Sequence, residues 1–249
     1  MESQGKWTIP VRRVQRIMVL MGGVSAERSV SLKSGAAVSA AAKAAGYEVL
    51  SFDFDGDLPR LIAALKSEQI QVVFNTLHGK FGEDGILQGV LDLLQIPYSH
   101  SGKLASSLAM DKPIARTIFA AAGLPIATGI TMSGEEFVAS LRAGLDPLPR
   151  PYIVKPPAEG SSIGVRLVRP GDNRLPLDSA DWELGESVLI ESYIPGRELT
   201  VAVLGEGAQA QALGAIEIIP QPDSNDAEAL NFFDYSAKYT SGGAKHILP

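Results

Sequence analysis

Over the first hundred residues, apolar runs typical of buried strands alternate with helix-forming stretches, and this alternation constrains the fold more than any other feature. Ile17–Met21 is a continuous apolar run bounded by glycine, as in a parallel strand buried on both faces. The alanine-rich stretch Ser31–Ala45 stops at Gly46, which predicts a helix with a glycine C-cap. Further strands are expected at Tyr47–Phe52 and Val72–Phe74, and further helices at Leu58–Lys66 and Ile86–Leu94. The pattern predicts a doubly wound α/β domain with ligands outside the carboxyl ends of its strands.

The second half of the chain has a different pattern. Helices are expected at Leu104–Ala109 and Pro113–Ala122, and from about Ile126 onward short apolar runs alternate with turn residues. This pattern predicts a largely antiparallel sheet, and therefore α+β structure in a second structural unit. The expected strands are Tyr152–Val154, Val165–Val168, Val188–Ser192, Leu199–Leu204 and Ala212–Ile219.

Composition excludes several classes of protein. The chain has 249 residues, 45% of them apolar and 20% charged, as in a globular protein with one large or two modest domains. The net charge of −6 disfavours nucleic-acid binding, which needs a basic surface. The absence of cysteine excludes disulfides and thiolate metal sites. No apolar segment near the start is long enough to span a bilayer, so we expect a cytoplasmic protein without a membrane partner.

A lysine stands at the end of the expected strand Tyr152–Val154. Lys155 is followed by a short loop rich in glycine and serine, which includes Ser161 and Ser162. A strand that ends in a cation and turns through small residues can close backbone N–H groups over a polyphosphate. No Walker A pattern occurs in the chain. An ordinary hairpin turn with a solvated lysine is an equally open interpretation of this loop alone.

Two glycine-rich loops follow the first and third expected strands. Glu27, in the first loop, could hold a substrate ammonium, or it could simply complement the dipole of the following helix. Ser25 or Ser29 could cap that helix. His78, in the second loop, could donate a hydrogen bond to a carboxylate or phosphate, or it could be an ordinary, partly buried histidine.

Lys112 occupies an unusual position for a cation. Asp111 is a natural N-cap and Pro113 suits a first helical turn, so Lys112 stands at the start of a helix. The helix dipole disfavours a cation at that end. A nearby anion would remove the conflict.

Two further motifs lie in the second half. Glu191 and Glu198 stand seven residues apart across a Pro-Gly turn, and such carboxylates suit ribose hydroxyls or an adenine amino group. A polar hairpin is the alternative. The aromatic segment 232–239 contains Lys238 and Tyr239 and could form a lid over a site, or a loop pinned by its aromatic residues.

Taken together and in this order, these segments resemble the D-alanine–D-alanine ligases of the ATP-grasp superfamily, from Arg16 to Pro249. The matching segments are GGVSAERSVSLKSG, LHGKFGEDGILQG, AMDKPIA, VKPPAEGSSIGV, IESYIPGRELTVAVLG and FFDYSAKY. The resemblance implies an ATP-grasp fold with an N-terminal doubly wound parallel-sheet domain. It implies three domains: a Rossmann-like substrate domain over 1–111, a central ATP-grasp lid domain over 112–196 and an incomplete C-terminal ATP-grasp domain over 197–249.

The resemblance also implies a reaction in two steps. ATP phosphorylates the carboxylate of a first D-alanine, and the amine of a second D-alanine attacks the resulting acyl phosphate. The product, D-alanyl-D-alanine, is used in peptidoglycan synthesis. ATP and Mg²⁺ (or Mn²⁺) are the implied cofactors, and a cytoplasmic homodimer is the implied state.

Residue roles follow from the matched positions. Glu27 is expected to hold the ammonium of the first D-alanine, and His78 to lie beside its carboxylate. The expected catalytic set consists of Glu27, Ser161 and Tyr239, and the expected substrate-binding set adds His78 and Lys238. The expected ATP-binding residues are Lys112, Lys155, Glu159, Ser161, Ser162, Glu191, Ser192, Tyr193, Ile194, Glu198 and Lys238.

The resemblance has one departure. The family's Arg-x-Asp strand and Glu-x-Asn segment, which supply a transition-state arginine and the magnesium ligands, have no match after Tyr239. We therefore expect the metal ligands beyond residue 249, and a truncated ligase of doubtful activity. The alternatives are another ATP-grasp enzyme, such as a D-alanine–D-lactate ligase, and an inactive nucleotide-binding remnant.

Overall fold

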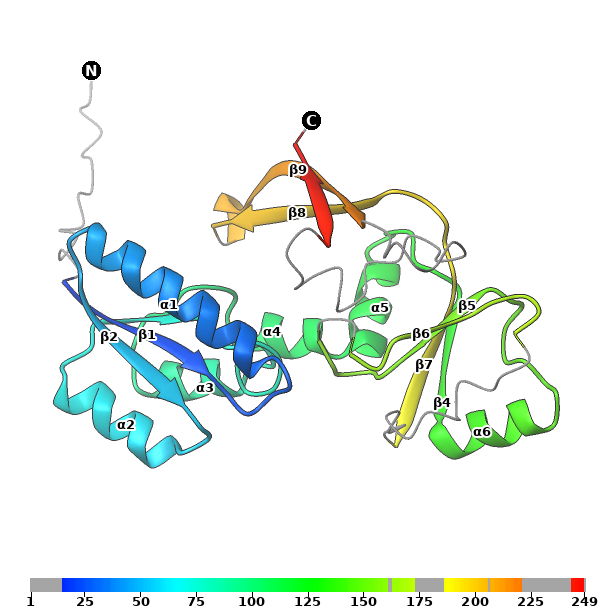
Figure 1. Cartoon of the computed structure of the whole chain (residues 1–249), viewed down its shortest axis with the longest axis horizontal. Helices are drawn as coiled ribbons and strands as arrows, with labels where there is room; N and C mark the ends of the chain where they lie inside the picture. Colours follow the sequence, from blue (N-terminus) through cyan, green and yellow to red (C-terminus); the bar gives the residue numbers. More distant parts are fainter. Residues whose placement is uncertain (1–14, 161–162, 173–185, 206, 221–242, 249) are drawn as a thin grey trace, which may run out of the picture. The chain divides into compact units, whose positions relative to one another are not determined.

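A computed structural model describes residues 15–160, 163–172, 186–205, 207–220 and 243–248 (Figure 1). The chain divides into two compact units, Met1–Ser107 and Leu108–Pro249. The division into three domains at residues 111 and 196 stays a prediction. Among the described residues, no helix is both long enough and apolar enough to cross a lipid bilayer.

The first unit is built on a parallel sheet in the order β2-β1-β3. Its strands are β1 (Arg16–Gly22), β2 (Glu48–Phe54) and β3 (Val72–Asn75). β1 pairs in parallel with both neighbours, and its residues from Ile17 onward are buried. The prediction of a parallel strand buried on both faces is confirmed.

Helices cover both faces of this sheet, which confirms the doubly wound arrangement. α1 (Arg28–Ala44) covers the face that carries Ile17, Val19 and Met21. α2 (Leu58–Ser67) and α3 (Ile86–Leu93) cover the opposite face. The buried core on that side consists of Met18, Leu20, Phe52, Phe54, Leu61, Leu65, Ile70, Val73, Leu77, Leu87 and Leu91.

The start of α1 differs from the prediction. The helix begins at Arg28, and its N-cap is Glu27, whose side chain makes no capping hydrogen bond. Neither Ser25 nor Ser29 caps it, because the Ser25 hydroxyl is used between two loops and Ser29 lies inside the helix. At the other end, Gly46 has a φ of +90° just past the C-cap, so the predicted glycine C-cap is confirmed.

A buried serine ties the ends of β1 and β3 together. The Ser31 hydroxyl accepts a hydrogen bond of 2.9 Å from the Gly22 N–H and donates one of 2.7 Å to the Thr76 carbonyl. Ser31 is completely buried. The two loops that leave these strands therefore start from one shared anchor.

The second unit contains a four-stranded sheet in the order β4-β7-β5-β6, with antiparallel pairing throughout. Its strands are β4 (Gly129–Ser133), β5 (Tyr152–Lys155), β6 (Arg166–Val168) and β7 (Ser187–Ser192). The helices are α4 (Lys103–Met110), at the division between the units, α5 (Lys112–Ala121) and α6 (Gly134–Arg142). The predicted antiparallel sheet is confirmed.

β4 and α6 were absent from the sequence-based prediction. α6 begins with a capping box, in which Ser133 and Glu136 satisfy each other's backbone N–H groups. The Ser-x-x-Glu pattern before Phe137 is the local signal that would have found this helix.

The two faces of this sheet have different chemistry. α6 covers one face, whose buried core consists of Phe137, Leu141, Tyr152, Val154, Val168, Val188 and Ile190. Side chains alternate along a strand, so Lys155 on β5 and Glu191 on β7 belong to the other face. Lys155 ends β5 and Glu191 is the last residue but one of β7, so both charged side chains lie near strand ends.

A second sheet in this unit has the order β10-β9-β8. Its strands are β8 (Glu198–Leu204), β9 (Gln211–Pro220) and β10 (Ala244–Ile247), all antiparallel. The short 3-10 helix η1 (Gly207–Gln209) stands between β8 and β9. These pairings confirm the two strands that were predicted after residue 198.

Candidate functional site

In the first unit, the loops that follow β1 and β3 meet. The Ser25 hydroxyl donates a hydrogen bond of 2.9 Å to the His78 carbonyl and accepts one of 3.2 Å from the Glu27 N–H. The Glu27 side chain lies under these loops, and the residue is only 1% exposed. Its carboxylate oxygen Oε2 would lie 3.2 Å from a β-carbon placed on Gly79. Glu27 and His78 are therefore held at one edge of the sheet, where ligands of such folds bind.

The His78 loop is stabilised by several polar contacts. The Gly79 N–H donates a hydrogen bond of 2.6 Å to Glu83, whose other carboxylate oxygen lies 3.9 Å from His78 Nδ1. The Gly82 carbonyl accepts hydrogen bonds from the side-chain amides of Asn75 (2.9 Å) and Gln88 (2.8 Å). The loop therefore has a defined shape, which fixes the backbone on both sides of His78.

In the second unit, Glu191 lies between two cations. Its Oε1 accepts a hydrogen bond from Arg116 Nη1, and its Oε2 pairs with Lys155 Nζ. All three side chains are less than one-quarter exposed. Arg116 comes from α5, Lys155 from the end of β5 and Glu191 from β7, so the cluster depends on how these elements pack.

Lys112 lies close to this cluster. Its Nζ donates hydrogen bonds to the carbonyls of Pro156 (3.2 Å) and Glu159 (2.5 Å), in the loop that follows Lys155. Burial and the neighbouring charge of Lys155 lower the pKa of Lys112 to about 8. The shift persists although the carboxylates of Glu159, Glu191 and Asp111 favour the charged form. Lys112 is therefore a cation for which a further anion would be favourable.

The cluster has the composition of an anion site. Lys112, Lys155 and Arg116 bring three positive charges to the surroundings of Glu191, and the carboxylates of Glu159 and Asp111 also lie near Lys112. Lysine and arginine around a strand-end loop are suited to a polyphosphate. The donors present therefore fit the phosphates of a nucleotide.

The described residues do not form a metal site by themselves. Among them, no group of three or more His, Asp or Glu side chains lies close enough together to hold a metal ion. Glu191, the buried carboxylate of the cluster, is already paired with two cations. The described residues alone therefore do not fit Mg²⁺.

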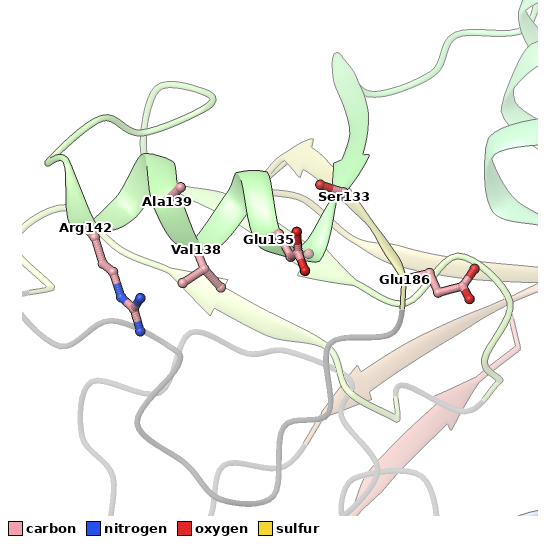
Figure 2. A pocket seen from close by; sticks show the side chains of 7 residues that line it. Ser133, Glu135, Val138, Ala139, Arg142 and Glu186 are labelled. Atoms are coloured by element: carbon pink, nitrogen blue, oxygen red, sulfur yellow. The ribbon is translucent and has the colours of Figure 1, made fainter.

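Described residues line hollows near the sheet of the second unit. One of about 680 Å³ lies beside α6 and is lined by Ser133, Glu135, Arg142 and Glu186, among others (Figure 2). No described residue of the predicted site lines it. A second hollow, of about 410 Å³, includes Arg116 and Leu189 and so borders the charged cluster.

Comparisons with known proteins identify the family. The family model described as "D-ala D-ala ligase C-terminus" matches residues 118–249, and "D-ala D-ala ligase N-terminus" matches residues 56–101. The D-alanine–D-alanine ligase of Granulibacter bethesdensis is 50% identical over 236 residues, which cover 95% of this chain and 71% of that protein. The chain belongs to the D-alanine–D-alanine ligase family.

Solved structures of this family agree with the fold. The D-alanine–D-alanine ligase from Bacillus anthracis has a TM-score of 0.70 and 32% identity, covering 94% of this chain and 72% of that one. The same enzyme complexed with ATP has a TM-score of 0.68 and 31% identity, covering 95% and 71%. The ATP-grasp fold that the resemblance implied is confirmed.

The structure brings some of the residues expected in such a ligase together. Lys112, Lys155 and Glu191 lie in one cluster, and the backbone of Glu159 joins it through Lys112. In the other unit, Glu27 and His78 lie in adjoining loops.

Other expected residues lie near the end of β7 and the start of β8. Ser192 ends β7, and the Tyr193 N–H donates a hydrogen bond of 3.1 Å to the Pro151 carbonyl. Ile194 is 66% exposed, and Glu198 begins β8. Four expected residues lie outside the described ones: Ser161, Ser162, Lys238 and Tyr239. The predicted contact between Glu27, Ser161 and Tyr239 therefore stays a prediction.

Arg116 was not among the residues that the sequence singled out. Glu191 was expected among the ATP-binding residues, and in the structure its carboxylate pairs with Arg116 and Lys155. The signal for Arg116 was its spacing of four residues from Lys112, which places both on one side of α5. The sequence does not show which carboxylate contacts this side of α5, because that contact depends on tertiary packing.

Proposed function

We propose that this chain carries the first D-alanine site and the ATP-phosphate site of an ADP-forming ligase that joins two D-alanines. The observation that carries the proposal is the cluster of three cations around Glu191, beside the strand-end loop of Lys155. A group of closely spaced cations that includes a lysine of lowered pKa favours a polyanion, because an anion stabilises the protonated lysine. Family membership assigns that polyanion as ATP.

Lys155 and Lys112 hold the phosphates. Fixed cations neutralise charge on the phosphoryl group while it moves from ATP to the carboxylate of the first D-alanine. Lys112 also holds the Pro156–Glu159 backbone, so the loop that closes over the phosphates is attached to α5.

Glu27 and His78 hold the first D-alanine. A buried carboxylate is a strong partner for an ammonium group, because the surrounding protein excludes competing water. An imidazole N–H can donate to the carboxylate that becomes phosphorylated. This assignment leaves the second D-alanine to attack the acyl phosphate, releasing phosphate and giving the dipeptide for peptidoglycan synthesis.

The remaining assignments of the family complete the proposal. Ser161, Lys238 and Tyr239 contribute to the D-alanine site, and Ser162, Ser192, Tyr193, Ile194 and Glu198 to the ATP site. We place the enzyme in the cytoplasm, where ATP is available, and propose a homodimer. The residues supporting the two sites lie in two different units of the chain.

Isothermal titration calorimetry with the 249-residue chain tests the proposal. ADP and D-alanine should each bind. Lys155→Gln should weaken ADP at least about tenfold and leave D-alanine binding intact, because one charged contact is worth more than 1.4 kcal/mol. Glu27→Gln should weaken D-alanine binding and leave ADP binding intact. Unchanged binding of D-alanine to Glu27→Gln would contradict the D-alanine site, and ADP binding without any D-alanine binding would favour the nucleotide-binding remnant.

A further inference from the structure

In the proposed function, the Lys155 ammonium has two anionic partners: the Glu191 carboxylate and a nucleotide phosphate. In the structure its Nζ pairs with Glu191, yet the proposed reaction needs the same ammonium for a phosphate. The Glu191 side chain is only 12% exposed. If Lys155 were its sole partner, nucleotide binding would leave a nearly buried carboxylate without a counter-ion, which is strongly unfavourable.

Arg116 is a second cation that can neutralise Glu191 when Lys155 binds a phosphate. Its Nη1 donates to Glu191 Oε1, the oxygen that Lys155 does not use. Its Nη2 donates a hydrogen bond of 2.7 Å to the Ala127 carbonyl. The Arg116 side chain is 16% exposed, so the planar guanidinium is fixed between a carboxylate and a backbone oxygen.

The two cations differ in what else they can do. Arg116 has both of its terminal nitrogens engaged by protein oxygens, whereas the ion pair of Lys155 Nζ among the described residues is the one with Glu191. A lysine ammonium sits on a flexible stem and can be redirected, while a guanidinium held at two points cannot. Lys155 is therefore the partner that moves.

We propose that Arg116 is a positioning residue that acts as the permanent counter-ion of Glu191 and so releases Lys155 to bind a nucleotide phosphate. This inference rests on the proposed function, because it requires that Lys155 binds phosphate. It assigns no contact between Arg116 and the nucleotide. Lys112 lies beside the pair, and its charged neighbours are Lys155, Glu159, Glu191 and Asp111.

A double-mutant cycle measured by calorimetry tests the inference. Arg116→Gln should weaken ADP at least about tenfold, the loss expected when a largely buried carboxylate loses its remaining cation. Adenosine, which has no phosphate, should bind Arg116→Gln as it binds the wild type. The Glu191→Gln variant has no carboxylate at this position to neutralise. Adding Arg116→Gln to that variant should therefore change its ADP affinity less than twofold.

Two further variants separate positioning from a general loss of structure. Arg116→Lys keeps a cation and should recover most of the ADP affinity. Arg142→Gln removes an exposed arginine from α6, on the other face of the sheet, and should leave ADP binding unchanged. Thermal unfolding of each variant identifies any that fails to fold.

The outcomes distinguish the inference from the proposed function. If wild-type chain does not bind ADP, the phosphate site fails and the inference fails with it. If wild-type chain binds ADP but Arg116→Gln binds equally well, only the inference is overturned. An equal loss of ADP affinity with and without Glu191→Gln also overturns it, because Arg116 would then act independently of Glu191.

Discussion

The hydroxyl of Ser25 donates a hydrogen bond to the carbonyl of His78 and so joins the loops after β1 and β3. The same oxygen accepts the N–H of Glu27. One small side chain therefore sets the relative positions of the two residues proposed to hold the first D-alanine.

Ser25→Ala should weaken D-alanine binding severalfold while ADP binding stays the same. Loss of two hydrogen bonds to one hydroxyl should also lower the free energy of unfolding by about 1–2 kcal/mol. Calorimetry and urea unfolding measure the two effects. Ser29→Ala, at an exposed position in the first turn of α1, is the matched control and should change stability by less than about 0.5 kcal/mol. Equal effects from both variants would contradict the role of Ser25.

Gly79→Ala should damage the D-alanine site more than the fold. Gly79 has a φ of +63°, and an added β-carbon would stand 3.2 Å from Glu27 Oε2. Gly46 also has positive φ, but an added β-carbon there meets nothing within 4 Å. Both substitutions to alanine should cost about 1 kcal/mol of stability from backbone strain, and only Gly79→Ala should weaken D-alanine binding. A comparable loss of D-alanine affinity in Gly46→Ala would refute this distinction.

ADP binding should be linked to the protonation of Lys112. The pKa of Lys112 is lowered to about 8, and a phosphate nearby stabilises its charged form and raises that pKa. The free protein therefore loses this proton as pH rises through about 8, whereas the ADP complex keeps it. ADP binding at pH 8.5 should take up protons, and ADP affinity should fall as pH rises from 8 to 10.

Calorimetry in buffers of different ionisation enthalpy measures this proton uptake. In Lys112→Arg the side chain stays charged, so the uptake should vanish while ADP still binds. Uptake that persists in Lys112→Arg would show that another group titrates.

Asp111 should have two separable roles. Its carboxylate accepts a hydrogen bond of 2.9 Å from the Ile114 N–H as the N-cap of α5, and its charge favours protonated Lys112. Asp111→Asn keeps a good cap, so stability should change little while the pH midpoint of ADP-linked proton uptake moves lower. Asp111→Ala should show the lower midpoint and also lose about 1 kcal/mol of stability. A midpoint unchanged in both variants would rule out the charge effect.

Local sequence patterns predicted the elements that have strong local signals. The buried run of β1, the glycine that ends α1 and the Asp111 cap were all read correctly, because each depends on a few neighbouring residues. β4 was missed because its signal is weak, since it begins at a glycine, and α6 was missed although its capping box is a clear local signal.

The charged cluster could be predicted only in part. Lys112 and Lys155 stood out because each occupies an unusual place in its element. The contacts of Glu191 depend on the register of β5 against β7 and on where α5 packs. No local pattern encodes those long-range relations, so the contact between Arg116 and Glu191 was not predicted.

Ser31, buried beneath the ends of β1 and β3, has a thermodynamic consequence for ligand binding. Because its hydroxyl holds Gly22 and Thr76 together, the conformational entropy of the two strand ends is lost during folding rather than on ligand binding. D-alanine has very few atoms with which to offset the cost of ordering a loop. A preorganised site lets nearly all of the contact energy of such a small ligand appear as affinity.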